Sequence, residues 1–208
     1  MKGLFDGVRE FSKNDFEKNK ELFKRLSKAQ QPHTLFIGCS DSRIVPDLIT
    51  KSLPGDLFVV RNVANVVPYY RASSEFLSTT SAIEFAVMVL NVENIVICGH
   101  SNCGGCKALF LDEEDFQKIP HTRKWLELAK NARVRAEAIV KKVGNQGDIE
   151  WLVEQENIVE QMNHLITYPF VEERYEKGLI KLYGWYYDIG TGIVYNYNRG
   201  EKVFERIE

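Results

Sequence analysis

The sequence predicts an α/β fold: a mainly parallel central β-sheet of about four parallel strands plus an antiparallel edge strand, flanked by helices. Short apolar runs alternate with segments of helical periodicity, as in βαβ units. Two of these runs, TLFIGC and ENIVICGH, are continuously apolar, as the buried strands of parallel sheets are. The last two runs are separated by a glycine-containing turn, which is typical of a hairpin and supplies the antiparallel edge.

Five segments have the composition of strands. The first is the apolar run TLFIGC, and the second follows the turn made by Pro54 and Gly55. The third, ENIVICGH, is again continuously apolar. The last two flank the turn Gly190-Thr191-Gly192 and form the predicted hairpin. The five segments cover residues 34–39, 56–64, 93–100, 179–189 and 193–198.

Three segments carry apolar residues at helical spacing, and we expect helices from Ser74 to Val92, from Trp125 to Val143 and from Ile149 to Ile166. Residues 82–92 include a single charged side chain, Glu84. The first helix is therefore expected to be deeply buried, with a partner for the Glu84 carboxylate.

Residues 1–30 are rich in charge but contain an apolar stripe, which includes Phe16, Phe23 and Leu26. They predict an N-terminal helical arm that packs on another surface, and we expect that surface to belong to a partner subunit. No repeat, low-complexity segment or linker marks a second domain. Residues 1–208 are therefore expected to form a single domain that includes the arm.

Composition excludes several classes of function. The chain has 208 residues, 44% of them hydrophobic, and a formal net charge of −2, so no overall attraction to nucleic acid or to an anionic membrane follows. No apolar run approaches the roughly 20 residues that span a bilayer, and the N-terminus is too charged for a secretory signal. We expect a cytoplasmic protein with reduced thiols and with neither nucleic-acid nor membrane partners.

Two of the predicted strands end in polar turns that contain cysteine. IGCSDSR (37–43) supplies Cys39, and ICGHSNCGG (97–105) supplies His100 and Cys103. Ligand sites in open α/β sheets form at the carboxyl ends of strands, so these three side chains converge if the two strands are neighbours. Two thiolates and one imidazole suit Zn²⁺ and leave a fourth position open, as catalytic zinc sites do.

Other interpretations of the cysteines remain. Cys103 and Cys106 form a CxxC pair, which in a redox protein would carry a reactive thiol. Cys98 has apolar neighbours and is expected to be a packed core thiol. Asp41 and Arg43 taken alone would be an ordinary surface ion pair. The remaining histidines are expected at the surface or in helix caps; they are His33, His121 and His164.

Three motifs, CSDSR (39–43), RNVAN (61–65) and GHSNCGG (99–105), resemble in order and spacing those of the β-class carbonic anhydrases, most closely the plant-like type. The resemblance extends over nearly the whole chain. It implies one Zn²⁺ per subunit, held by Cys39, His100 and Cys103, and it implies that Cys106 is not a ligand. It also implies that Asp41 and Arg43 form a catalytic dyad.

The resemblance further implies the reversible hydration of carbon dioxide to bicarbonate and a proton by zinc-bound hydroxide, the lyase activity of a carbonate dehydratase. Asp41, held by Arg43, would accept the hydrogen of that hydroxide, or would fill the fourth zinc position if Arg43 released it. The implied substrate-binding groups are Gln30, Phe58, Val63, Phe85 and the backbone N–H of Gly104. In this family both subunits contribute to the site, which implies a homodimer or a higher oligomer.

Two further functions remain compatible with the same motifs. Some similar proteins hydrolyse carbon disulfide or carbonyl sulfide, and access to the pocket decides between these substrates and carbon dioxide. A zinc-stabilised protein without catalytic activity is the other alternative. The intact pair Asp41 and Arg43 favours an enzyme, because a purely structural zinc site gains little from it.

Overall fold

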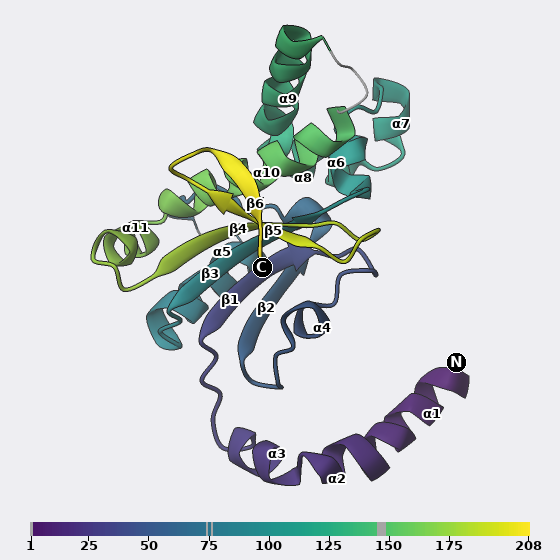
Figure 1. Cartoon of the computed structure of the whole chain (residues 1–208), viewed down its shortest axis with the longest axis vertical. Helices are drawn as coiled ribbons and strands as arrows, with labels where there is room; N and C mark the ends of the chain where they lie inside the picture. Colours follow the sequence, from purple (N-terminus) through teal and green to yellow (C-terminus); the bar gives the residue numbers. More distant parts are fainter. Residues whose placement is uncertain (1, 74, 76, 145–148) are drawn as a thin grey trace.

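The computed structural model describes residues 2–73, 75, 77–144 and 149–208, and contains a six-stranded sheet in the order β2-β1-β3-β4-β5-β6 (Figure 1). Strands β2, β1, β3 and β4 are parallel, whereas β5 and β6 are antiparallel to their neighbours. This confirms the predicted fold class. The strands are β1 (Thr34–Cys39), β2 (Leu57–Asn62), β3 (Asn94–His100), β4 (Lys181–Tyr187), β5 (Val194–Asn198) and β6 (Val203–Arg206).

The amino-acid pattern of each strand follows its place in the sheet. All six residues of β1 and six of the seven residues of β3 are buried, which explains their continuous apolar runs. Strand β2 lies at the sheet edge and is only partly buried. Strand β6 was not among the predicted strands, because its sequence VFER is short and half charged and therefore carries no strand pattern.

Helix α10 (Ile149–Ile166) packs directly against strands β3 and β4. A Cβ atom at Gly99 of β3 would lie 2.7 Å from the Ile158 side chain, and one at Gly184 of β4 would lie 2.5 Å from Met162. These two glycines therefore allow the helix to approach the sheet closely. The predicted helix 149–166 is confirmed, and its packing fixes the helix against the carboxyl half of β3.

Apart from α9, the other α-helices are shorter than ten residues. The helix predicted from Trp125 to Val143 is interrupted, because Ala129 has a non-helical backbone with φ −108° and ψ 3°. The remaining helices are α1 (Lys2–Glu10), α2 (Phe16–Lys18), α3 (Lys20–Leu26), α4 (Pro46–Thr50), α5 (Ser78–Glu84), α6 (Gly104–Ala108), α7 (Glu113–Gln117), α8 (Pro120–Leu126), α9 (Lys130–Val143) and α11 (Pro169–Glu176). Among the described residues, no helix is both long and apolar enough to cross a membrane.

The expectation of a deeply buried helix before β3 is wrong. Ser74 and Phe76 lie outside the described residues; α5 begins at Ser78 and continues into a π-helical turn over Phe85–Val89. The Glu84 side chain is exposed and needs no buried partner. Phe85, Met88 and Val89 are 41%, 50% and 58% exposed, because only the opposite side of the helix packs on the sheet. This surface, Phe85, Met88 and Val89, is called the α5 apolar face below.

The N-terminal arm is helical, as predicted, and extends away from the sheet (Figure 1). None of the residues in its helices is buried. The rings of Phe11, Phe16 and Phe23 pack on one another, with the last two stacked at 5.2 Å. Leu4, Phe5 and Val8 of α1 remain exposed. The α1 part of the arm therefore presents an apolar stripe that nothing within the described residues covers, whereas Leu26 at the end of α3 lies against Gly55.

Candidate metal centre

The sheet brings the ends of β1 and β3 together. These strands are parallel neighbours, with Gly38 opposite Cys98, so Cys39 and His100 both lie at the carboxyl edge. Cys103 follows after a turn in which Asn102 adopts a left-handed backbone with φ 55°, and it caps the start of α6. One ligand atom each from Cys39, His100 and Cys103 lies within 4.8 Å of the other two. The predicted convergence is thus present in the geometry.

His100 is oriented to bind a metal through one nitrogen. Its side chain is completely buried, and Nδ1 lies 3.0 Å from the carbonyl oxygen of Ser101, to which it donates a hydrogen bond. Nε2 has no hydrogen-bond partner among the described residues. A histidine with Nδ1–H held by a carbonyl presents the Nε2 lone pair, as metal-binding histidines commonly do.

The two thiols fit the same ion. Cys39 Sγ and Cys103 Sγ are 4.0 Å apart. Two sulfurs bound to tetrahedral zinc at about 2.3 Å stand about 3.8 Å apart. The neighbouring Cys103 thiol and burial raise the pKa of Cys39 to about 12, and a bound cation would lower it by compensating the thiolate charge. The donor set therefore suits Zn²⁺.

The other two cysteines are not part of this group. Cys98 is fully buried among Phe36 and Val96, as expected for a core thiol, and its Sγ faces the Gly99 carbonyl. Cys106 is also buried and free; its thiol raises the pKa of the Cys103 thiol. The geometry thus distinguishes Cys103, which faces Cys39, from Cys106 one turn later.

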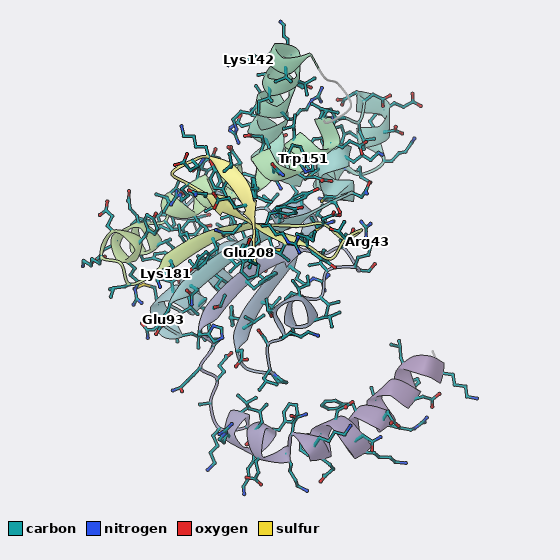
Figure 2. All side chains as sticks on the ribbon, in the orientation of Figure 1. Arg43, Glu93, Lys142, Trp151, Lys181 and Glu208 are labelled. Carbon is teal, nitrogen blue, oxygen red and sulfur yellow. The ribbon has the colours of Figure 1, made fainter. Side chains whose placement is uncertain are left out.

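Asp41 and Arg43 form a two-pronged ion pair beside the cysteines. Arg43 Nε lies 2.8 Å from Asp41 Oδ1 and Arg43 Nη2 lies 2.7 Å from Oδ2. These hydrogen bonds hold the pKa of the Asp41 carboxyl well below its usual range. Asp41 Oδ2 is 3.9 Å from His100 Nε2. Glu93 and Lys181 mark the starts of β3 and β4, and Figure 2 shows Arg43 at the opposite end of the sheet.

Two arginines fix the turn that carries Asp41. Arg43 Nη2 also donates to the Asn102 carbonyl at 2.9 Å, which joins this turn to the one before Cys103. Arg61, on the neighbouring strand β2, donates to the carbonyls of Cys39 at 3.0 Å and Asp41 at 2.6 Å. The carboxylate is therefore held by its own turn and by both adjacent strand ends.

Sequence reasoning missed Glu154 on α10. The carboxylate accepts a hydrogen bond from the backbone N–H of Cys103 at 2.8 Å and another from the Tyr186 hydroxyl at 3.0 Å. Burial raises the pKa of Glu154 to about 7. A signal was present, because Glu154, Asn157, Gln161 and His164 form a polar stripe at helical spacing on a helix otherwise suited to burial.

The predicted substrate-binding residues are only partly gathered within one chain. Gly104 directly follows Cys103 and is exposed. Val63 lies beside the next residue, since a Cβ at Gly105 would be 3.0 Å from Val63 Cγ1. These two positions adjoin the metal ligands.

Gln30, Phe58 and Phe85 lie elsewhere in the same chain. Phe58 pairs with Leu35, near the start of β1, and its ring is 6.0 Å from that of Phe85. Gln30 precedes β1, whereas Cys39 ends it. Since a strand rises about 3.3 Å per residue, the length of β1 separates these groups from the metal ligands of their own chain.

Comparison with known proteins gives a consistent result. Residues 34–194 match the family model described as carbonic anhydrase. A protein of Helicobacter pylori strain J99 named carbonic anhydrase is 40% identical over 206 residues, which covers 98% of this chain and 93% of the relative.

Solved structures agree with the sequence comparison. The β-carbonic anhydrase CcaA superposes with a TM-score of 0.90 and 34% identity over 100% of this chain and 92% of its own. One of two tetrameric β-carbonic anhydrases from Sordaria macrospora superposes with a TM-score of 0.80 and 30% identity, covering 93% of this chain and 94% of its own. The similarity therefore includes the sheet, the helices and the strand ends that carry the candidate metal ligands.

Proposed function

The chain belongs to the β-class carbonic anhydrases, and we propose on that premise that it is a zinc-dependent carbonate dehydratase, which interconverts carbon dioxide and bicarbonate. The observation that carries this proposal is the convergence of Cys39 Sγ, His100 Nε2 and Cys103 Sγ beside an ionised carboxylate. A structural zinc site has no need of that carboxylate. It needs a fourth protein ligand, and the metal-ligand group of the described residues has three members.

Each ligand has a defined task in holding Zn²⁺. Cys39 and Cys103 supply thiolates whose charge the metal balances, and His100 supplies Nε2 while the Ser101 carbonyl fixes its tautomer. When bound, zinc supplies a Lewis acid that makes water a nucleophile near neutral pH. The three protein ligands leave room for that water.

Asp41 orients the reacting water in this proposal. The Arg43 hydrogen bonds keep the carboxylate ionised, so its oxygens only accept hydrogen bonds. Oδ2, the oxygen nearer to His100 Nε2, would accept a hydrogen bond from a water molecule beside the metal ligands and so orient that water toward the substrate. Arg43 acts by holding Asp41 in place.

A partner subunit completes the substrate pocket in this proposal. Gln30, Phe58 and Phe85 are remote from the metal ligands of their own chain, and two apolar surfaces, the α5 apolar face and the stripe of the arm, are uncovered. We infer a homodimer or higher oligomer in which the arm packs on the neighbouring subunit. The tetrameric relatives from Sordaria macrospora support this inference. The expected cytoplasmic location stays a prediction.

The metal ligands are tested with a matched pair of cysteines. Cys103→Ser removes a ligand, while Cys106→Ser changes an equally buried thiol one helical turn away. We expect Cys103→Ser to lower zinc affinity by more than about 100-fold, beyond the 10–100-fold loss typical of outer partners. Cys106→Ser should retain zinc and activity. Metal analysis of purified protein and stopped-flow hydration of carbon dioxide measure both. If both variants retain zinc, the proposed metal site is wrong.

The reaction is tested with Asp41→Asn, which is nearly isosteric and lacks the charge. We expect full zinc content and a kcat/KM for carbon dioxide about 100-fold below wild type, the scale of one lost catalytic hydrogen bond. Equal and negligible hydration rates in wild type and variant, with zinc bound in both, would contradict the proposal. Assays with carbon disulfide and carbonyl sulfide then separate a sulfur-specific hydrolase from a non-catalytic protein.

A further inference from the structure

Glu154 contacts the candidate metal centre from helix α10, on the side of the Cys103 backbone. Helix α10 packs against β3 where Ile158 faces Gly99, and Glu154 lies one turn earlier on the same side of the helix. Its Oε1 accepts the backbone N–H of Cys103, and its Oε2 accepts the Tyr186 hydroxyl. The residue is 4% exposed, so neither bond competes freely with water.

This arrangement is costly by itself. No lysine, arginine or histidine among the described residues forms an ion pair with Glu154, unlike Glu156 and Glu160 on the same helix, which pair with Arg135. A buried carboxylate without a cation is unfavourable unless its hydrogen bonds compensate it. One of its hydrogen bonds holds the backbone of Cys103. The other, from Tyr186, keeps the carboxylate in place against that backbone.

We propose that Glu154 is a positioning residue of the metal centre. By holding the Cys103 N–H, it fixes the start of α6 and thereby places Cys103 Sγ against Cys39 Sγ and His100 Nε2. Tyr186 keeps the carboxylate in that orientation. Glu154 touches neither the candidate ligand atoms nor the substrate position, so it acts on the metal through the Cys103 backbone. This inference rests on the proposed function, because that proposal identifies the bound ion as zinc.

Zinc affinity is the direct test, measured by competition with a chelator for the full chain. Glu154→Ala should weaken zinc binding by about 10–100-fold, as loss of a residue that orients a ligand does. Glu154→Gln should bind within about threefold of wild type, because the amide oxygen accepts the same N–H. Glu156→Ala, on the same helix, is the matched control and should bind zinc as wild type does.

A second readout separates positioning from general destabilisation. In Co²⁺-substituted protein, the thiolate-to-cobalt charge-transfer band reports the geometry of the two sulfurs. It should shift in Glu154→Ala, return in Glu154→Gln and stay unchanged in Glu156→Ala. If Glu154→Ala does not fold, Tyr186→Phe replaces it, with an expected loss of zinc affinity of at least about threefold, below the range for a directly orienting residue.

Two results overturn the inference. One is that Glu154→Ala has the same zinc affinity and the same cobalt spectrum as wild type. If Tyr186→Phe is used instead, an unchanged zinc affinity overturns the inference in the same way. The other is an equal loss in Glu156→Ala, which would show a general effect of the helix. A wild-type chain that binds no zinc would instead remove the proposed function, so the two failures are distinguishable.

Discussion

Helix α10 and the N-terminal arm both carry apolar stripes, yet α10 has nine buried residues and the arm helices have none. The polar side chains of α10 are satisfied inside the chain. Asn157 donates to the Ala64 carbonyl and Gln161 accepts from the Val67 N–H, each at 2.8 Å. The phenylalanines of the arm pack on one another, and among the described residues the arm touches the body of the chain at its end, where Leu26 lies against Gly55.

The difference shows which apolar surfaces of the subunit are covered within a single chain. Helix α10 covers one side of the sheet within the chain. The same helix also holds the segment after β2, through hydrogen bonds to the backbone of that segment. The arm and the α5 apolar face are not closed within one chain. Substitutions near α10 should therefore act on folding, whereas those on the arm and the α5 apolar face should act on association.

The largest effect on folding is expected at Ile158. This side chain is fully buried against Gly99 and Gly184, so Ile158→Ala leaves a cavity between helix and sheet. We expect the free energy of unfolding to fall by about 3 kcal/mol, within the range for isoleucine-to-alanine changes in cores. Urea unfolding measures it, with Val8→Ala on the arm as the control in dissociated protein. Equal losses in the two variants would remove the distinction between the regions.

A smaller effect is expected at Glu160, where α10 buries charge. Its carboxylate contacts Arg135 at 2.7 Å, Asn131 at 3.0 Å and His164 at 3.1 Å. Burial alone would raise the pKa of Glu160, but hydrogen bonds from Asn131 and Arg135 outweigh it and lower the pKa. Glu160→Gln should cost about 2 kcal/mol at pH 7, the scale of hydrogen bonds to charged groups.

The pH dependence of this effect has a definite sign. A carboxyl whose pKa is lowered by folding stabilises the folded state above its unfolded pKa of about 4.3. That contribution is lost as the pH falls through the folded pKa. The difference in unfolding free energy between wild type and Glu160→Gln should therefore shrink below about pH 4. A difference that stays constant from pH 7 to pH 3 would show that the Glu160 charge is irrelevant.

The smallest effect on folding, but a clear effect on assembly, is expected on the α5 apolar face. Val89→Asp should weaken subunit association by about 10–100-fold, because the interface would bury an unpaired charge. The unfolding free energy of the dissociated chain should change by less than about 0.5 kcal/mol. Val134→Asp, at a valine of α9 that is 61% exposed, is the control. Sedimentation measures both variants, and unchanged association for Val89→Asp would place the interface elsewhere.

Much of the fold could be predicted because buried parallel strands have an unmistakable composition. The convergence of Cys39, His100 and Cys103 followed from strand ends alone, since parallel neighbours share an edge. The predictions failed where burial depends on contacts that a linear pattern does not contain. His164 was expected at the surface or in a helix cap, yet it is buried within α10, with its ring nitrogens at the Val67 carbonyl and Glu160.

The opposite error concerns apolar residues. Phe85, Met88 and Val89 predict burial, and the single chain leaves them exposed because the sequence does not tell an intramolecular core from an intersubunit surface. Glu154 was missed although it belongs to the polar stripe of α10, because the stripe does not show which of its members meets the backbone N–H of Cys103 and the Tyr186 hydroxyl.

The Arg43 guanidinium has a consequence for how the enzyme could be turned off. The same Nη2 atom binds the Asp41 carboxylate and the Asn102 carbonyl. Rotation of the Asp41 side chain away from Arg43 would break both Arg43 side-chain hydrogen bonds and the hydrogen bond from the Arg43 backbone N–H to Oδ1. Arg43 would keep its bond to the Asn102 carbonyl, so self-blockade by this carboxylate would cost the ion pair and leave the turn before Cys103 in place.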